Sequence, residues 1–324
     1  MEIFKMKNPQ PEKTNQKPNA IAEPCCLKKK LILLISVSIL LLVLSTNQKT
    51  TAQNVLTTKY RFPYNLTYSA QKFMLPRELT EISGIVYFDK NTIIGIQDEK
   101  GRLYFYDIRE KKITREIKFF DEGDFEDIAL VGNSMFALRS DGLLVEVENF
   151  TSKENLTVKK YFTPLSLKND CEGLCYDKTT NSLFIALKEM NGIKEKDDQP
   201  GFRAIYSFDL DTKTLSEKPA YLIKISTLDI PEKYPSKSKK KSGEIKFKPS
   251  AVAIHPITNE IYVLASVGNK LIVLNRNGEV VYKTGLDKKF FPQPEGIAFS
   301  PEGSLFICNE GGDGTGTLLR FDMK

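Results

Sequence analysis

The stretch PQPEGIAFSPEGSLFICNEGG, residues 292–312, holds in 21 residues the pattern that decides the fold. Glu295 precedes a short apolar run, a turn of Ser, Pro, Glu and Gly follows, and a second apolar run ends at Asn309 and Glu310. Short runs rich in β-branched and aromatic residues, bounded by turn residues, predict strands. The stretch therefore predicts two antiparallel strands with a carboxylate just before the first and another just after the second.

This pattern is repeated along the chain. Each copy opens with a small or acidic pair and continues with an apolar run, a turn rich in Asp, Asn, Pro or Gly, and further apolar runs. No part of this region shows a sustained 3.6-residue period, which argues against long helices. The five copies are EISGIVYFDKNTIIGIQDEKGRLYFYDI (from Glu81), DFEDIALVGNSMFALRSDGLLVEVENF (from Asp124), DCEGLCYDKTTNSLFIALKE (from Asp170), KPSAVAIHPITNEIYVLASVGNKLIVLN (from Lys248) and QPEGIAFSPEGSLFICNEGGDGTGTLLRF (from Gln293).

The spacing of the copies predicts a β-propeller. Taking Ile85, Ile128, Leu174, Val252 and Ile297 as equivalent, the successive steps are 43, 46, 78 and 45 residues. Four strands in about 45 residues is typical of a propeller blade.

The long step of 78 residues is interpreted as one blade with two polar inserts. LFIALKE, AIYSFDL and YLIKIS supply its second, third and fourth strands, and the excess falls at about 190–202 and 229–247, where the second insert contains the Lys-rich SKSKKKSG. The sequence therefore predicts an all-β protein: a single propeller of five blades, each with four antiparallel strands, with six blades as the alternative.

The last copy ends after its third strand, at Phe321, so another segment must supply the fourth. YNLTYSAQKFML, residues 64–75, is a strand candidate without a blade of its own. Pairing this N-terminal strand with the last blade would close the ring and remove an exposed strand edge.

The residues before the repeats have a different composition. Seven Lys and three Glu give residues 1–30 a charge of +4 out of the total of +6, and Lys49 adds one more, so residues 53–324 carry only +1. A nucleic-acid-binding surface needs basic residues concentrated on the folded domain, so this distribution argues against a nucleic-acid partner.

The leader predicts export. Residues 1–30 form a polar, basic segment with the composition of disorder. Residues 31–52 contain the apolar LILLISVSILLLVL, residues 31–44, which suits either a signal peptide cleaved after Ala52 or an uncleaved membrane anchor. With Lys28–Lys30 held inside, both alternatives place the propeller, residues 60–324, outside the cytoplasmic membrane in the cell envelope.

The acidic positions of the repeats are expected to converge. Because the first two strands of a blade run antiparallel, the start of the first and the end of the second lie on one face, near the central channel. Before the first strands stand Glu126, Glu172 and Glu295, with Ser83 and Ser250 in the other two blades. After the second strands stand Asp98, Ser140, Lys188, Ser266 and Glu310. The neighbouring positions are Gln97, Arg139, Asn309, Glu81, Glu99 and Glu189.

These residues would surround the opening of the central channel, which we call the acidic funnel, and two interpretations of it remain open. Carboxylates and amides around one opening suit Ca²⁺, which binds oxygen ligands, and the metal set would be Glu126, Glu172, Glu295, Asp98, Glu310 and Asn309. Glu81, Gln97, Arg139, Lys188 and Glu189 would line the funnel, where Arg139 and Lys188 could instead hold an anion or neutralise carboxylates. Alternatively, the glutamates bond to the backbone of the next blade and serve only to join the blades.

Histidine and cysteine chemistry is restricted by composition. The chain has a single histidine, His255, which rules out a His–His metal pair and is expected in a turn on the face opposite the funnel. Cys171, Cys175 and Cys308 form an odd set within the body; Cys175 and Cys308 fall inside apolar runs, where a buried cysteine is more often a small core residue than a reactive one.

The ordered motifs ELTEISGI, DFEDIAL, NDCEGLCYD, KPSAVAIHP and QPEGIAFSPEGSLFICNEGG resemble the SdiA-regulated (YjiK/CarP-like) β-propeller family over about residues 75–324. The resemblance implies a cell-envelope propeller with a calcium link and without an established catalytic activity. That family is also similar to phytase-like propellers. We therefore expect a non-catalytic, Ca²⁺-linked binding or signalling protein with an unidentified small-molecule or protein ligand; the alternative is a metal-dependent phosphoesterase or lactonase acting at the same funnel.

Overall fold

The computed structural model describes residues 60–152, 156–230 and 246–324 of the chain. The predicted leader segments, 1–30 and 31–52, and the Lys-rich SKSKKKSG of the second insert lie outside the described residues. Residues Tyr60–Lys324 make up one compact unit. No helix in the described part of the chain is long and apolar enough to cross a membrane.

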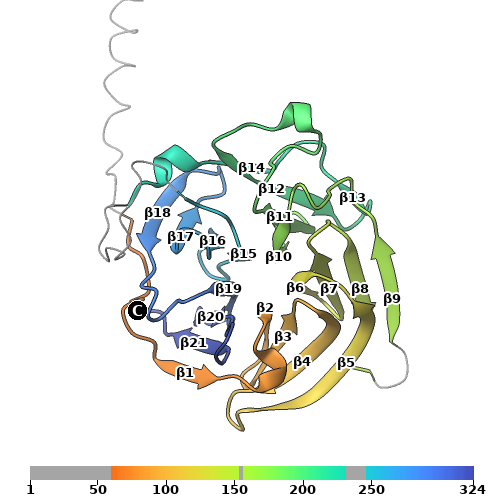
Figure 1. The fold of residues 1–324 in the computed structure, drawn as a ribbon, viewed down its shortest axis with the longest axis vertical. Helices are drawn as coiled ribbons and strands as arrows, with labels where there is room; N and C mark the ends of the chain where they lie inside the picture. The colour runs from red at the N-terminus through yellow and green to blue at the C-terminus, as the bar shows by residue number, and fades with distance from the viewer. Residues whose placement is uncertain (1–59, 153–155, 231–245) are drawn as a thin grey trace, which may run out of the picture. The chain divides into compact units, whose positions relative to one another are not determined.

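The described residues form five antiparallel sheets arranged as the blades of a β-propeller (Figure 1). Blade 1 contains β2 (Ile82–Asp89), β3 (Thr92–Gln97), β4 (Lys100–Asp107) and β5 (Lys112–Glu122). Blade 2 contains β6 (Phe125–Val131), β7 (Ser134–Arg139), β8 (Leu144–Glu148) and β9 (Thr157–Tyr161). Blade 4 contains β15 (Ala251–Ile254), β16 (Ile261–Ala265), β17 (Lys270–Leu274) and β18 (Val280–Gly285). The prediction of five four-stranded blades is confirmed.

Blade 3 accounts for the 78-residue step. Its strands are β10 (Cys171–Asp177), β11 (Ser182–Leu187), β12 (Phe202–Asp209), β13 (Thr214–Leu215) and β14 (Tyr221–Lys224). Both β13 and β14 pair with β12, so two short strands share the fourth position. The first insert contains the short 3-10 helix η2 (Glu195–Asp197), and η3 (Ile225–Leu228) follows β14.

Blade 5 joins the two ends of the propeller sequence. It contains β19 (Pro294–Phe299), β20 (Leu305–Asn309) and β21 (Thr317–Phe321), and its outer strand is β1 (Gln71–Met74). β1 runs antiparallel to β21, with Phe73 opposite Leu318. The predicted closure by the N-terminal strand is confirmed, and the 3-10 helix η1 (Arg77–Leu79) leads from β1 into blade 1.

The hydrophobic core is divided among the five blade interfaces. Each cluster of buried apolar side chains lies between two neighbouring blades, including one between blades 5 and 1 that contains Phe73, Leu79, Tyr106 and Phe306. The alternation of strand residues supplies one apolar set to each side of a blade. Every blade therefore depends on both neighbours for burial, and the ring is stable only when it is closed.

The innermost strands, β2, β6, β10, β15 and β19, contact one another in sequence around the axis. Gly84, Gly173 and Gly296 lie where these strands approach one another. A Cβ atom on Gly84 would stand 2.6 Å from the Asp127 Cα, one on Gly173 would stand 2.8 Å from the Val252 nitrogen, and one on Gly296 would stand 3.2 Å from the Ile85 nitrogen. The crowding at the axis therefore accounts for the small residues at this repeat position. Cys171, Cys175 and Cys308 are buried free thiols.

Closure can be tested with two neighbouring residues of β1. Phe73 is 5% exposed and packs edge-on against Tyr106, whereas Met74 is 56% exposed. We expect Phe73→Ala to lower the free energy of unfolding by about 3–5 kcal/mol, because it leaves a cavity between blades 5 and 1.

The matched control is Met74→Ala, which changes the same strand on its exposed side and should stay within about 0.5 kcal/mol of the parent. Chemical denaturation of both variants measures the difference. Equal stabilities would contradict a structural role for the packing of β1 onto the ring.

Candidate functional site

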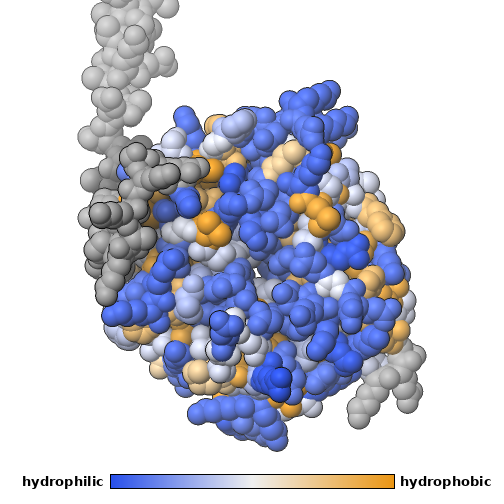
Figure 2. All heavy atoms as spheres, in the orientation of Figure 1, coloured by the Kyte–Doolittle hydropathy of each residue, from blue (hydrophilic) through white to orange (hydrophobic). Residues whose placement is uncertain are grey.

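The funnel face is the face of the propeller on which the innermost strands begin. In the strand pairs, Ile82 lies opposite Gln97, Phe125 opposite Arg139 and Pro294 opposite Asn309. The start of each first strand and the end of each second strand therefore share this face, as the sequence predicted. Figure 2 shows one face of the disc, on which hydrophilic side chains predominate around the centre.

Four of the innermost strands have a β-bulge close to their start. The register skips Ser83 in β2, Glu126 in β6, Glu172 in β10 and Glu295 in β19. A bulge leaves one residue unpaired in the ladder and changes the direction of its side chain. The three glutamates therefore occupy one local geometry in three blades. Ser250 stands directly before β15 in blade 4.

The serines at this repeat position join the blades. The Ser83 hydroxyl donates to the Phe125 carbonyl at 2.8 Å, and the Ser250 hydroxyl donates to the Pro294 carbonyl at 2.8 Å. Each bond runs from one blade to the first strand of the next. At this repeat position, the serines therefore make the bonds that join neighbouring blades, a role that the sequence suggested for the glutamates.

The glutamates at this position make different contacts. The Lys188 ammonium donates to Glu172 Oε1 at 2.5 Å and lies 3.6 Å from Asp170 Oδ2. Its positive charge also acts on Glu126 and Glu295. For Glu126, no hydrogen bond or ion pair to another described residue is found. We call Glu126, Glu172 and Glu295 the glutamate group, and Lys188 is the cation in its midst.

Burial and mutual repulsion disfavour ionisation of the glutamate group. Desolvation raises the pKa of Glu295 to about 8, and the charges of Glu172 and Glu310 add to the shift. The pKa values of Glu126 and Glu172 are also raised, first by desolvation; repulsion from Glu172 adds to the shift of Glu126, while Lys188 opposes the shift of Glu172. One ammonium therefore faces three carboxyl groups that are costly to ionise together.

A second acidic set, the rim group, lies where blades 5 and 1 meet. It consists of Glu81, Asp98 and Glu310. The Glu310 and Glu81 carboxyls share a hydrogen bond, Gln293 Nε2 donates to Glu310 Oε2, and the pKa values of Glu310 and Asp98 are raised, mainly by desolvation. The charge of Glu310 also acts on Glu295, which connects the rim group to the glutamate group.

The other predicted funnel residues are engaged elsewhere. Asn309 is fully buried and donates to the Phe290 carbonyl and the Thr317 hydroxyl, so it holds the β18–β19 connection. Gln97 accepts from the Lys100 backbone nitrogen. Arg139 forms a two-pronged ion pair with Asp141, at 2.9 and 2.6 Å. Glu189 pairs with Lys248. The structure therefore gathers only part of the predicted set.

Sequence reasoning missed Asp127, which is 1% exposed. Its carboxylate accepts from the backbone nitrogens of Ile128 and Leu174, each at 2.8 Å, and so links blades 2 and 3. An alignment of the five repeat copies could have identified Asp127 as unusual. The equivalent residues of the other blades are Gly84, Gly173, Ala251 and Gly296, and Asp127 alone among them has a side chain larger than a methyl group.

The donor chemistry suits a hard cation, but the predicted ligands are not gathered as one set. Among the described residues, no three His, Cys, Asp or Glu side chains are grouped as a metal site requires. Glu126, Glu172 and Glu295 surround an ammonium, whereas Asp98 and Glu310 belong to the rim group.

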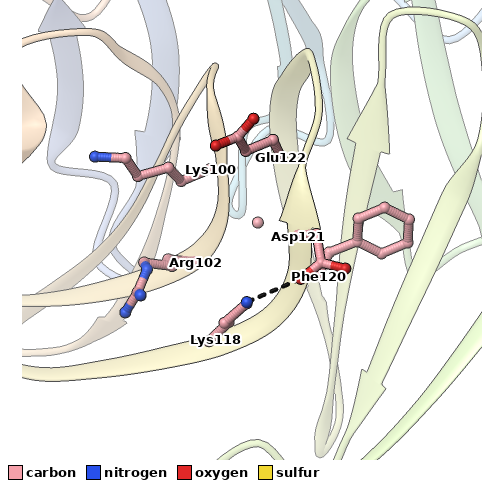
Figure 3. A pocket seen from close by; sticks show the side chains of 7 residues that line it. Lys100, Arg102, Lys118, Phe120, Asp121 and Glu122 are labelled. Carbon is pink, nitrogen blue, oxygen red and sulfur yellow. Dashed lines mark ion pairs between the residues drawn. The ribbon is translucent and has the colours of Figure 1, made fainter.

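A surface hollow of about 440 Å³ lies apart from the funnel, between β4 and β5. Lys100, Arg102 and Lys118 line it with Asp121 and Glu122 (Figure 3). Lys118 pairs with Asp121 at 2.8 Å, and Arg102 pairs with Glu116 at 3.3 Å. Because carboxylates already balance two of the three cations, the funnel remains the stronger candidate.

Comparison with known proteins identifies a family. The model of a protein family described as SdiA-regulated matches residues 64–312. A search of curated protein sequences finds no match.

Several solved structures are similar. Glutaminyl cyclase from Myxococcus xanthus is 12% identical, with a TM-score of 0.50 over 79% of this chain and 96% of that chain. A streptogramin B lyase is 12% identical, with a TM-score of 0.45 over 78% of this chain and 97% of that chain. A luciferin-regenerating enzyme is 12% identical, with a TM-score of 0.46 over 78% and 94%. At these identities the likeness concerns the fold alone.

The raised carboxyl pKa values predict how stability varies with pH. In the unfolded chain Glu295 ionises near its ordinary pKa of about 4.3, whereas folded Glu295 ionises near pH 8. Between these values the folded state holds more protons, so the free energy of unfolding decreases as pH rises. The melting temperature of the parent should therefore fall between about pH 5 and about pH 8. In Glu295→Gln we expect this fall to be smaller by a few degrees.

Glu302→Gln is the matched control, because Glu302 is exposed in the β19–β20 turn. This variant should keep the pH dependence of the parent. If the melting temperature falls equally in Glu295→Gln and in the parent over this range, folded Glu295 ionises near its ordinary pKa. The inference that its pKa is raised would then be wrong.

Proposed function

The chain belongs to the SdiA-regulated family, and we propose that it is a non-catalytic binding protein of the cell envelope whose funnel takes up a divalent cation, with Ca²⁺ as the expected ion. The observation that carries this proposal is the charge imbalance of the glutamate group. Three carboxyl groups, of which Glu172 is buried and Glu126 and Glu295 are half-buried, stand on equivalent bulges, and Lys188 pairs with Glu172 among them. A second cation would relieve the repulsion that now opposes their ionisation.

Glu126, Glu172 and Glu295 are the residues that would hold the ion, and because they are not grouped as a metal site requires, they would have to draw together around it. Ca²⁺ favours carboxylate oxygens and accepts flexible coordination that includes water. Protonated carboxyls must lose their protons to bind a cation, so uptake should be stronger at alkaline than at acidic pH and should release protons. Lys188 would remain paired with Asp170, which lies within 3.6 Å of its ammonium.

Thermal unfolding with and without Ca²⁺ tests this proposal. Ca²⁺ at about a hundred times its Kd should stabilise the folded protein by about 2.7 kcal/mol. In a protein of this size that raises the melting temperature by a few degrees. The double variant Glu172→Gln/Glu295→Gln should lose this increase while melting no lower than the parent in chelator, because it removes two charges that repel each other.

The control variant Glu217→Gln/Glu302→Gln removes two exposed carboxylates and should respond to Ca²⁺ like the parent. Absence of a Ca²⁺ effect in the parent, together with a lower melting temperature of the funnel variant in chelator, would contradict the proposal. That outcome would mean that the glutamates stabilise the fold, as the Glu172–Lys188 pair within blade 3 does, and hold no cation.

A metal-dependent phosphoesterase or lactonase at the same funnel is the second candidate. It is favoured by the different contacts of two glutamates: Glu172 pairs with Lys188, whereas no such ion pair to another described residue is found for Glu126, and carboxyls in different environments can act as acid and base. Assays of the protein for hydrolysis of phosphate esters and lactones, with and without Ca²⁺, distinguish the two functions. Turnover that the funnel double variant abolishes, but the control variant retains, would favour the enzyme.

We also propose that the leader exports the propeller, by way of residues 31–44. Alkaline phosphatase fused after Lys324 should therefore be active, and a reporter that works only in the cytoplasm should be inactive, because Lys28–Lys30 stay inside. The mass of the mature chain distinguishes cleavage after Ala52 from an uncleaved anchor. The reverse reporter pattern would show that the propeller is cytoplasmic.

A further inference from the structure

Residues 60–66, which we call the N-terminal strap, lie against the face opposite the funnel before the chain enters β1. The Tyr60 hydroxyl donates to Glu260 Oε2 at 2.9 Å, beside the β15–β16 turn. The Phe62 ring stacks on Tyr282 with a centroid distance of 4.1 Å and an interplanar angle of 6°. Tyr64 is 4% exposed and belongs to the core between blades 4 and 5. The strap therefore bridges two blades.

His255 lies beneath the strap and is fully buried, in the turn after β15 as the sequence predicted. Its Nδ1 accepts from the backbone nitrogens of Ile257 and Thr258, at 3.2 and 3.1 Å. Its Nε2 is 2.8 Å from the Tyr64 hydroxyl, which itself donates to the Gly303 carbonyl at 2.6 Å. These partners fix the neutral tautomer: Nδ1 is an acceptor, so the proton is on Nε2 and is donated to Tyr64.

Protonation cannot be accommodated in this arrangement. A proton on Nδ1 would turn the acceptor into a donor that faces two backbone N–H groups, and it would place a positive charge in a buried, mostly aromatic environment. The ring would have to leave its place to find an acceptor and water, and Tyr64 would then lose its partner. Because Tyr64 covers the ring, the strap is the part that must move to hydrate it.

We propose that His255 is a pH-sensitive lock on the N-terminal strap: in mildly acidic solution residues 60–66 detach from blades 4 and 5 while the blades stay folded. The blades keep their backbone ladders without the strap, and β1 stays paired with β21. Release would uncover the apolar surface of blades 4 and 5 on which Phe62 and Tyr64 pack.

The groups around the His255 ring determine whether the strap is released at low or at high pH. Tyr64 faces it from the strap, Tyr262 stacks on it from β16 at 5.7 Å and Phe299 meets it edge-on from β19 at 4.9 Å. Burial lowers the pKa of His255, and the Glu260 carboxylate opposes this shift. Just below the ordinary histidine pKa of about 6.5, the unfolded chain therefore binds more protons than the folded one. The contact between His255 and the strap is fully stable above this pH and weakens as pH falls.

The single histidine of the chain makes a direct test feasible. In the full chain, purified without a polyhistidine tag, ¹⁵N spectra should show a neutral ring protonated on Nε2 at neutral pH. Hydrogen exchange of the 60–66 peptide, corrected for intrinsic rates, should be about tenfold faster at about pH 5 than at about pH 7.5, the scale expected for one buried hydrogen bond. Peptides from β16 and β17 should not change.

Three variants complete the test. Tyr64→Phe should exchange rapidly in the strap at both pH values, and His255→Gln should remove the pH dependence. Tyr68→Phe is the matched control, because Tyr68 is 61% exposed, and it should behave like the parent. Exchange in the parent strap that is independent of pH, a ring protonated on Nδ1, or equal acceleration in β16 and β17 would each overturn the proposal.

Discussion

The close approach of five strands around one axis is the constraint on which the rest of the structure depends. At this axis three of the five residues that face the next blade are glycines, Gly84, Gly173 and Gly296, and a Cβ on Gly84 or Gly173 would stand less than 3.0 Å from atoms of the next blade. The crowding forces each blade to widen outward, so that its apolar faces meet those of both neighbours. The core is therefore distributed over five interfaces, and the one between blades 5 and 1 forms only when the ring is closed.

The same crowding explains why the polar residues of the repeats gather on one face. In four blades a bulge interrupts the ladder between the first two strands just before its last pair. The bulged residue stands beside the start of the next blade, where Ser83 is small enough to bond to its backbone. An ionised glutamate at this position has no proton to donate to that carbonyl, so its carboxylate takes a donor instead, as Glu172 does from Lys188.

The two faces of the propeller consequently have different characters. The funnel face collects carboxyl groups that resist ionisation, and its electrostatics depend on what occupies the space among them. The opposite face collects aromatic rings around His255 and carries the N-terminal strap. The chain thus closes the ring with β1 and crosses blades 4 and 5 with the strap. These two attachments differ physically, since the first is a backbone ladder, whereas the second rests mainly on side-chain contacts, with one backbone bond from the Lys324 nitrogen to the Pro63 carbonyl.

The sequence by itself determined the fold, because each blade repeats one local pattern of strands and turns. The repeat positions, the missing fourth strand after Phe321 and the strand near Phe73 could all be recognised, since periodicity and turn chemistry are local properties. The sequence also determined that the residues before strand one and after strand two share a face. That inference required only the antiparallel direction of adjacent strands.

Only the tertiary structure decided which of these residues act together. Arg139 turns to Asp141 and Asn309 turns into the β18–β19 connection, while Lys188 reaches Glu172; the sequence pattern assigned all three to the same ring. Likewise, His255 could be placed in a turn, but its bond to Tyr64 joins residues 191 positions apart. Side-chain direction and long-range pairing depend on bulges, on crowding and on neighbouring blades, which are set when the ring closes and leave no periodic signal in the chain.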